Sequence, residues 1–95
     1  MAVLLKLTVT PATHEQFDQL DASVGQATAQ AQGPPAGLMS HVVYPDGEGF
    51  VIADVWRTQA EGQAFLDEFV RPVLDALGLT VTATAALPVW SFARP

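Results

Sequence analysis

The amino-acid sequence predicts an α+β fold in which one four-stranded antiparallel sheet carries two helices on a single face. Strand-like and helix-like runs follow in the order strand, helix, strand, strand, helix, strand. Two capping boxes mark where the helices begin, and right-handed crossovers place both helices on the same side of the sheet. A chain of 95 residues holds one hydrophobic core, so we expect a single domain over residues 1–95.

The first strand is predicted over residues 2–10, where valine and leucine occupy both faces and Lys6 is the one charged side chain. A strand that is apolar on both sides is typical of the centre of a sheet that is covered from above and below. Pro11 has no amide hydrogen for a further ladder bond, so we expect the strand to end there.

The first helix is predicted to begin at Thr13, which forms a capping box with Gln16. Large apolar residues follow at the spacing of one helix face: Phe17, Leu20 and Val24. Residues 26–32 contain only alanine, glutamine and threonine, without a large apolar anchor. We therefore expect the helix to fray beyond Gly25.

The next two strands, Leu38–Tyr44 and Phe50–Arg57, are predicted to form an antiparallel hairpin, because the sequence PDGEG between them supplies turn residues. The second of these strands is again apolar on both faces, which predicts cover on both sides. A cluster of breaking residues separates this hairpin from the first helix: Gly33, Pro34, Pro35 and Gly37.

The second helix is predicted to begin at Thr58, which forms another capping box with Glu61, and to continue with helical periodicity to Gly78. Pro72 inside this run removes a backbone donor and clashes with the preceding turn. We expect a kink there, or a break into two short helices. Residues 80–87 alternate in the manner of a strand and complete the sheet.

This order of elements is that of the ferredoxin-like βαββαβ fold. Its two helices cover one face of the sheet and leave the other face open. Because the strands are apolar on both sides, a second copy packed sheet to sheet is the simplest cover. An apolar tail would also be poorly covered in a monomer: Val89, Trp90 and Phe92. We therefore expect a homodimer through the open sheet face.

The composition excludes several classes of protein. The chain has no cysteine, which rules out disulfides, thiolate zinc sites and a thiol nucleophile. Ten acidic residues against four basic ones, with a formal net charge of -6, argue against nucleic acid as a partner. No run approaches the roughly 20 apolar residues of a membrane span, and no secretory signal is recognisable. We expect a cytoplasmic protein.

The segment GLMSHVVYPDGEGFVIADVWRTQAEGQAFLDEFVRPVLDALGL resembles the dimeric α/β barrel superfamily, and especially the antibiotic biosynthesis monooxygenase-like proteins. The shared features are a glycine-led second strand with His41, a third strand ending Asp54-Val55-Trp56, and a capped helix with Phe65, Phe69 and Pro72. The likeness spans almost the whole chain. It implies a homodimer with a cleft between sheet and helices in each subunit.

Proteins of this type include cofactor-independent monooxygenases that act on aromatic polyketides, haem-degrading monooxygenases and lactone isomerases. The resemblance matches Trp56 to a tryptophan that lines the cleft, although core packing explains a buried tryptophan equally well. Where haem-degrading relatives have an asparagine and a histidine, this chain has Leu5 and Leu66. Neither leucine can ligate iron, so haem degradation is disfavoured. We take Trp56, Phe65 and Leu5 as candidate substrate-binding residues.

The candidate catalytic residues are His41, Asp54 and Tyr44. A histidine titrates near neutral pH and can accept a proton from a phenol. Asp54 shares a strand face with Trp56, and a carboxylate on a covered face needs a partner or a raised pKa. Lys6 is a candidate partner if both project to the same side. Each residue also has an ordinary structural explanation. His41 can be a hydrogen-bonded strand residue, Asp54 can form a structural hydrogen bond or an ion pair across the dimer, and Tyr44 can be an amphipathic side chain at a strand end.

Two functions remain open at this stage. The first is a cofactor-independent monooxygenase acting on an aromatic or polyketide-like molecule, with an isomerase or cyclase using the same acid-base groups. The second is a non-catalytic dimeric module that binds a small hydrophobic ligand or serves as an assembly unit. We expect neither cofactor nor metal, because the two histidines have no metal-binding spacing. A cavity shared by His41, Asp54 and Trp56 would favour the enzyme; a filled region, or structural pairing of the polar residues, would favour the module.

Overall fold

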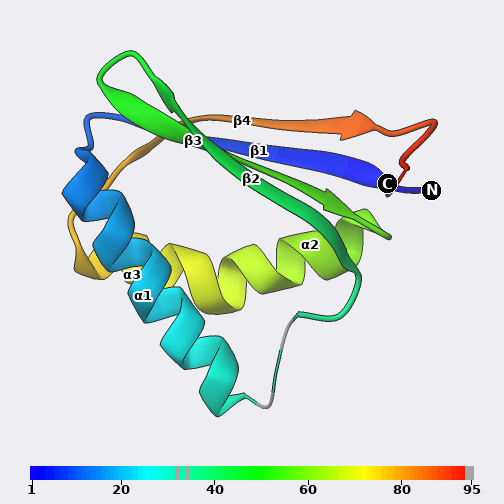
Figure 1. Cartoon of the computed structure of the whole chain (residues 1–95), viewed down its shortest axis with the longest axis horizontal. Helices are drawn as coiled ribbons and strands as arrows, with labels where there is room; N and C mark the ends of the chain where they lie inside the picture. Colours follow the sequence, from blue (N-terminus) through cyan, green and yellow to red (C-terminus); the bar gives the residue numbers. More distant parts are fainter. Residues whose placement is uncertain (32, 34, 94–95) are drawn as a thin grey trace.

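The computed structural model describes residues 1–31, 33 and 35–93, and it confirms the predicted α+β, ferredoxin-like architecture (Figure 1). Four strands form one antiparallel sheet in the order β2-β3-β1-β4, and the helical segments lie on one face of it (Figure 1). The strands are β1 (Val3–Val9), β2 (Leu38–Asp46), β3 (Gly49–Trp56) and β4 (Val81–Pro88). The parts of the predictions that concern Gln32, Pro34 and Arg94 lie outside the described residues.

The first helix, α1 (His14–Gln30), begins at the predicted capping box. The Thr13 hydroxyl accepts from the Gln16 amide, and the Gln16 side chain accepts from the Thr13 amide. The prediction that this helix frays beyond Gly25 is wrong, because regular helix continues to Gln30. Alanine and glutamine are strong helix formers, so the segment stays helical without a large apolar anchor.

The second helical run consists of α2 (Gln59–Phe65), a π-helical turn η1 (Leu66–Val70) and α3 (Arg71–Ala76). The predicted interruption is present, but it is a π turn that precedes Pro72. There the Arg71 amide donates to the Leu66 carbonyl, five residues back. In a regular helix the proline ring would clash with the carbonyl four residues before it, and the wider turn relieves that clash.

At the start of α2, only one of the two hydrogen bonds of the predicted capping box forms. The Thr58 hydroxyl accepts from the Glu61 amide, as expected. The Glu61 carboxylate, however, accepts from the Thr58 hydroxyl and from the Arg57 guanidinium. This hydrogen bond from Arg57 is the main reason that the pKa of Glu61 is lowered.

The β2-β3 hairpin sets the register on which the candidate site depends. Both strands extend further into the PDGEG sequence than predicted, and only Gly47 and Glu48 separate them. Gly47 turns the chain with a φ of 57°, a left-handed conformation that glycine adopts without steric cost. With this turn, His41 lies directly opposite Asp54.

The sheet has two unlike faces. On the helix side, alternate residues of β1 and β3 pack against the helices in one core, which includes Val3, Leu5, Leu7, Val9, Ile52 and Trp56. On the other side, cross-strand neighbours form a row of short or apolar side chains around one cation: Ala85, Lys6, Ala53 and Val42. Val42 is 52% exposed and Leu87 47% exposed, so this face is open in the single chain, as predicted.

The apolar tail is also exposed in the single chain, as the sequence predicts. The Trp90 side chain is 93% exposed and that of Phe92 is 37% exposed. In the part of the chain that the structure describes, no helix is long and apolar enough to cross a membrane.

Gly62 allows α2 to approach the sheet closely. A Cβ atom at this position would lie 2.6 Å from Leu5 Cδ1 and 2.7 Å from Trp56 Cδ1. Such contacts are far inside van der Waals separation, and both neighbours are buried in the core. Gly25 in α1 is the opposite case, since a Cβ atom there would meet no described atom within 4 Å.

We predict that Gly62→Ala and Gly25→Ala change stability in opposite directions. Gly62→Ala should destabilise the fold by about 1–3 kcal/mol through overpacking, although alanine is the better helix former. Gly25→Ala should stabilise it by about 0.5–1 kcal/mol. Urea denaturation of the two variants measures both free energies of unfolding. A stabilising Gly62→Ala would contradict this account of the packing.

Candidate functional site

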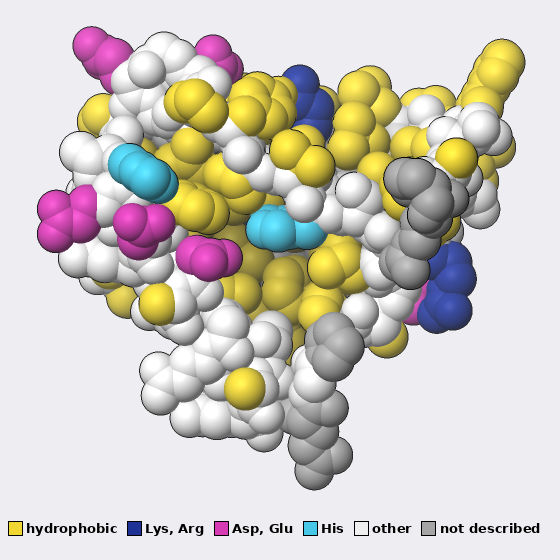
Figure 2. All heavy atoms as spheres, viewed as in Figure 1, with side chains coloured by type: hydrophobic (Ala, Val, Ile, Leu, Met, Phe, Trp, Pro, Cys, Tyr) yellow, Lys and Arg dark blue, Asp and Glu magenta, His cyan; other side chains and the backbone are white. Residues whose placement is uncertain are grey.

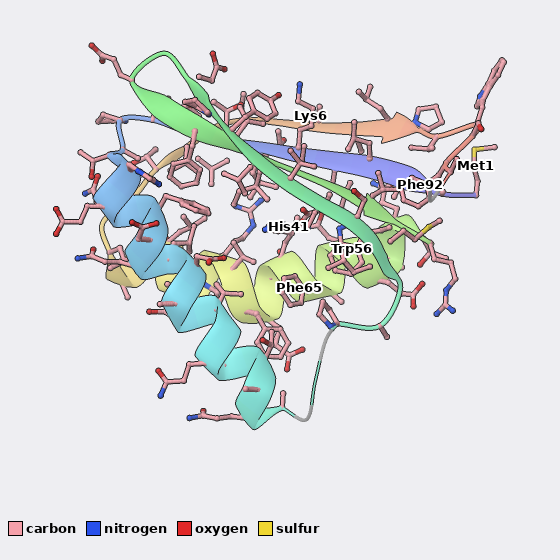
Figure 3. The ribbon with its side chains drawn as sticks, in the orientation of Figure 1. Met1, Lys6, His41, Trp56, Phe65 and Phe92 are labelled. Carbon is pink, nitrogen blue, oxygen red and sulfur yellow. The ribbon has the colours of Figure 1, made fainter. Side chains whose placement is uncertain are left out.

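A histidine and a buried aspartate form a hydrogen-bonded pair on the helix side of the sheet. His41 projects from β2 toward the helices (Figure 3), and its Nδ1 lies 2.6 Å from Asp54 Oδ1 on β3. The Asp54 side chain is only 6% exposed, whereas that of His41 is 48% exposed. The carboxylate therefore has its partner inside the protein, while the imidazole reaches from it toward solvent.

Lys6 is not the partner of Asp54, which corrects the suggestion made from the sequence. Successive residues of a strand point to opposite faces, and in β1 it is Leu5, not Lys6, that lies opposite Asp54. Lys6 therefore projects from the open face of the sheet (Figure 3). The prediction that Asp54 lies on the same face as Trp56 is confirmed, since both are buried on the helix side.

The pKa of His41 is raised above its ordinary value of 6.5. The hydrogen bond to Asp54 is the main cause; partial burial opposes it, and the negative charges of Asp54 and Asp21 add to the rise. Because the folded state holds the proton more tightly than the unfolded chain, the pair stabilises the fold fully below the unfolded pKa of about 6.5. That contribution is lost as the pH rises through the folded pKa.

His41 and Asp54 both line a cavity of about 200 Å³ between α1, the β2-β3 hairpin and the second helical run. Most of the other lining side chains are apolar, and they include Phe17, Leu20, Val24, Ile52, Phe65 and Val70. Figure 2 shows this hollow from outside, with hydrophobic side chains inside it and a histidine at its edge. We call it the His41 cavity. An apolar cavity with few polar groups is the usual form of a small-molecule site.

A second pocket, of about 350 Å³, adjoins the His41 cavity along the groove between α1 and β2. Phe17 lines both, and its ring packs edge-on against Phe50 at a centroid distance of 5.3 Å. Tyr44 lines this second pocket and not the His41 cavity. Strand alternation places Tyr44 on the other side of β2 from His41. The structure therefore separates Tyr44 from the two other candidate catalytic residues.

The three candidate substrate-binding residues lie in two layers. Phe65 lines the His41 cavity, and its ring centroid is 5.5 Å from that of Trp56. Trp56 is fully buried, and Leu5 is 5% exposed; both lie behind the cavity wall in contact with α2. The Trp56 Nε1 atom is buried and has no hydrogen-bond partner among the described residues. Trp56 and Leu5 thus support the cavity without lining it.

Sequence reasoning missed Phe17 and Asp21 as cavity residues. The helical spacing identifies Phe17 only as an anchor of α1, yet it lines both pockets. Asp21 lies one helical turn after Phe17, and residues four apart share a helix face. That spacing is the signal that would have placed the carboxylate on the cavity side of α1. Among the described residues, no group of three or more acidic or histidine side chains is arranged to hold a metal ion.

Solved structures resemble this chain over its whole length. A Mycobacterium tuberculosis protein, Rv0793, superposes with a TM-score of 0.65 at 15% identity, covering 99% of this chain and 100% of its own. SnoaB from Streptomyces nogalater, a cofactor-independent oxygenase, gives 0.61 at 16% identity, covering 99% and 96%. A Deinococcus radiodurans protein, provisionally assigned as an antibiotic biosynthesis monooxygenase, gives 0.62 at 19% identity, covering 100% and 98%.

No protein-family model and no curated protein sequence matches the chain. The likeness at these identities is one of fold, and it agrees with the resemblance seen in the sequence. The chain therefore has the fold of the antibiotic biosynthesis monooxygenase-like proteins.

Proposed function

We propose that this chain is a small-molecule enzyme of the cofactor-independent monooxygenase type, acting on an aromatic or polyketide-like substrate in the His41 cavity. The observation that carries the proposal is the His41–Asp54 pair in the wall of an apolar cavity. The fold shared with the oxygenase SnoaB supports it. The proposed catalytic groups are His41 as base and Asp54 as the residue that positions it.

The pair is suited to base catalysis because Asp54 selects one tautomer of the imidazole. A carboxylate only accepts hydrogen bonds, so the neutral ring carries its hydrogen on Nδ1 and donates it to Asp54. The lone pair of Nε2 is then available to a substrate hydroxyl. In the described part of the chain, only Nδ1 of this ring is hydrogen-bonded. The same logic orients the histidine in serine hydrolases.

The proposed reaction needs no redox group from the protein. Nε2 removes the hydroxyl proton of the phenolic enol tautomer, in which the methylene carbon carries a single hydrogen, and the electron pair of the anion at that carbon forms a C–O bond to dioxygen. The protonated His41 ring stays beside the anion and returns its proton to the peroxide, which becomes a hydroperoxide. Nε2 then removes the remaining C–H proton; the C–H electron pair forms the ketone as the O–O bond breaks, and the departing hydroxide takes this proton, so that R₂CH₂ and O₂ become R₂C=O and H₂O. The substrate supplies all the electrons. The apolar lining keeps bulk water away from the anion.

Two other functions use the same geometry. An isomerase or cyclase would need only the proton transfer by His41. A non-catalytic module is favoured by two observations: Trp56 does not line the His41 cavity, and His41 and Asp54 satisfy each other, which a purely structural pair would also do. The experiment below separates these readings from the oxygenase.

We predict that His41→Gln abolishes protein-dependent oxidation of 1,8-dihydroxyanthrone, a phenol with an activated methylene. An oxygen electrode and the absorbance of the anthraquinone product measure the rate. kcat/KM should fall roughly 10²–10⁴-fold, the usual contribution of a general base, while Asp75→Asn on the exposed side of α3 should keep the wild-type rate. The wild-type rate should rise with pH through the raised pKa of His41, because only the neutral ring accepts a proton.

Each outcome of this experiment supports or contradicts one of the proposed functions. An equal rate for His41→Gln and wild type would overturn the role of His41. Binding of the anthrone without oxygen consumption would favour the non-catalytic module. Proton exchange at the methylene carbon without oxygen consumption would favour an isomerase or cyclase.

We further propose that a second copy of the chain covers the open sheet face. Three of the four strands contribute an apolar side chain to the central row of this face, namely Ala85, Ala53 and Val42. The fourth residue of the row, Lys6, is its one charge. A stable homodimer interface buries roughly 1,200 Å² or more in total, and the open face of a four-stranded sheet is the surface proposed to supply it. The exposed Val42 and Leu87 side chains would be among its anchors.

We predict that the wild-type chain sediments as a dimer and that Val42→Asp sediments as a monomer, because a buried unpaired carboxylate costs several kcal/mol. Gln19→Asp, which adds the same charge on an exposed position of α1, is the control and should remain dimeric. Analytical ultracentrifugation measures the mass. A monomeric wild type, or a dimeric Val42→Asp, would contradict the proposed interface.

A further inference from the structure

We propose that the His41 cavity selects its ligand by charge, accepting uncharged or positively charged aromatic molecules and excluding carboxylates and other anions. The proposal rests on the proposed function in one respect: the cavity must be a ligand site. It adds the charge class of the substrate, which neither the fold nor the base mechanism specifies. A phenol, an aromatic ketone or an aromatic amine would fit this class; an aromatic acid would not.

The first support is the charge of the cavity lining. Asp21 on α1 and Asp54 on β3 both line the cavity. Among the described residues, no lysine or arginine lines the cavity or the pocket that adjoins it. Whether His41 is neutral or protonated, it and the two carboxylates together carry a net negative charge. An anion that enters this space finds no lysine or arginine in the described part of the chain to replace its lost hydration, and the positive charge of a protonated His41 is already offset by Asp54.

The positions of the basic residues also argue against an anionic ligand. Lys6 projects from the opposite face of the sheet (Figure 3). Arg57 is bound by Glu61, and Arg71 lies 3.4 Å from Asp67. Each of the basic side chains in residues 1–93 is thus on another surface or engaged by an acid of its own. Apart from His41, whose positive charge Asp54 offsets, no basic side chain in this part of the chain is placed to compensate an anionic ligand.

The third support is that the charge of Asp21 reaches the cavity. Its field contributes to the raised pKa of His41, although it forms no hydrogen bond with that ring. Figure 2 shows further Asp and Glu side chains beside the hollow, on the side where α1 begins. A carboxylate that acts on His41 through space will act in the same way on a charged ligand atom placed beside His41. It will attract a cation and repel an anion.

Three probes with the same ring separate charge from shape: 2-naphthalenemethanol, 2-naphthylmethylamine and 2-naphthoate, which are neutral, cationic and anionic at pH 7. Titration calorimetry gives each Kd, and NMR shifts of Phe65 and His41 locate the binding. At low salt we expect the amine to bind at least as tightly as the alcohol, and the naphthoate roughly tenfold or more weakly than the alcohol. That is the effect of one unit charge at a few ångströms in a partly solvated site.

Asp21→Asn tests the source of the selectivity. It should weaken binding of the amine roughly threefold to tenfold, strengthen that of the naphthoate, and leave the alcohol unchanged. Asp75→Asn removes the same charge far from the cavity lining and should change none of the three. Naphthoate binding as tightly as the alcohol in the wild type would overturn the charge selection alone. Failure of the alcohol itself to bind at Phe65 and His41 would overturn the ligand site, and the inference with it.

Discussion

Within residues 1–31, 33 and 35–93, the carboxylate of Asp54 is the one charged group buried on the helix side of the sheet, and the site is organised around it. Transfer of an ionised carboxylate out of water costs several kcal/mol unless it is paired and hydrogen-bonded. Among the described residues its side-chain partner is His41, on the neighbouring strand. The bond therefore does two things at once: it makes the buried charge tolerable, and it fixes the orientation and the tautomer of a half-exposed imidazole.

The cavity beside this pair exists because the two helical runs approach the sheet differently. Gly62 brings α2 into direct contact with Leu5 and Trp56, which closes that end of the sheet. The region under α1 remains open, and Phe17 and Phe65 both line it. The acid-base pair, the apolar walls and the carboxylate of Asp21 thus all meet in one space, which is why we place substrate binding, proton transfer and charge selection there.

The sequence was sufficient for the order of the elements, because periodicity, capping boxes and two-faced strands are local signals. It was insufficient for the pairing of His41 with Asp54. Had Tyr44 and Phe50 been the closing pair of the hairpin, as the predicted strand ends imply, His41 would lie opposite Ala53 and on the other face from Asp54. A register shift of one residue reverses every side chain, and the tighter turn at Gly47 was not evident from composition. The spacing of Asp21 from Phe17 shows which face of α1 it shares, but not that this face borders a cavity, because the cavity forms only when α1 packs over the sheet.

Titration of the histidine ring nitrogens by NMR tests the central claim, that Asp54 controls the chemistry of His41. In the wild type the pKa of His41 should lie above that of a free histidine, with Nδ1 protonated in the neutral form. Asp54→Asn should lower this pKa clearly, and Asp21→Asn should lower it less, since Asp21 acts only through space. An ordinary pKa in the wild type, or one that Asp54→Asn leaves unchanged, would contradict the account.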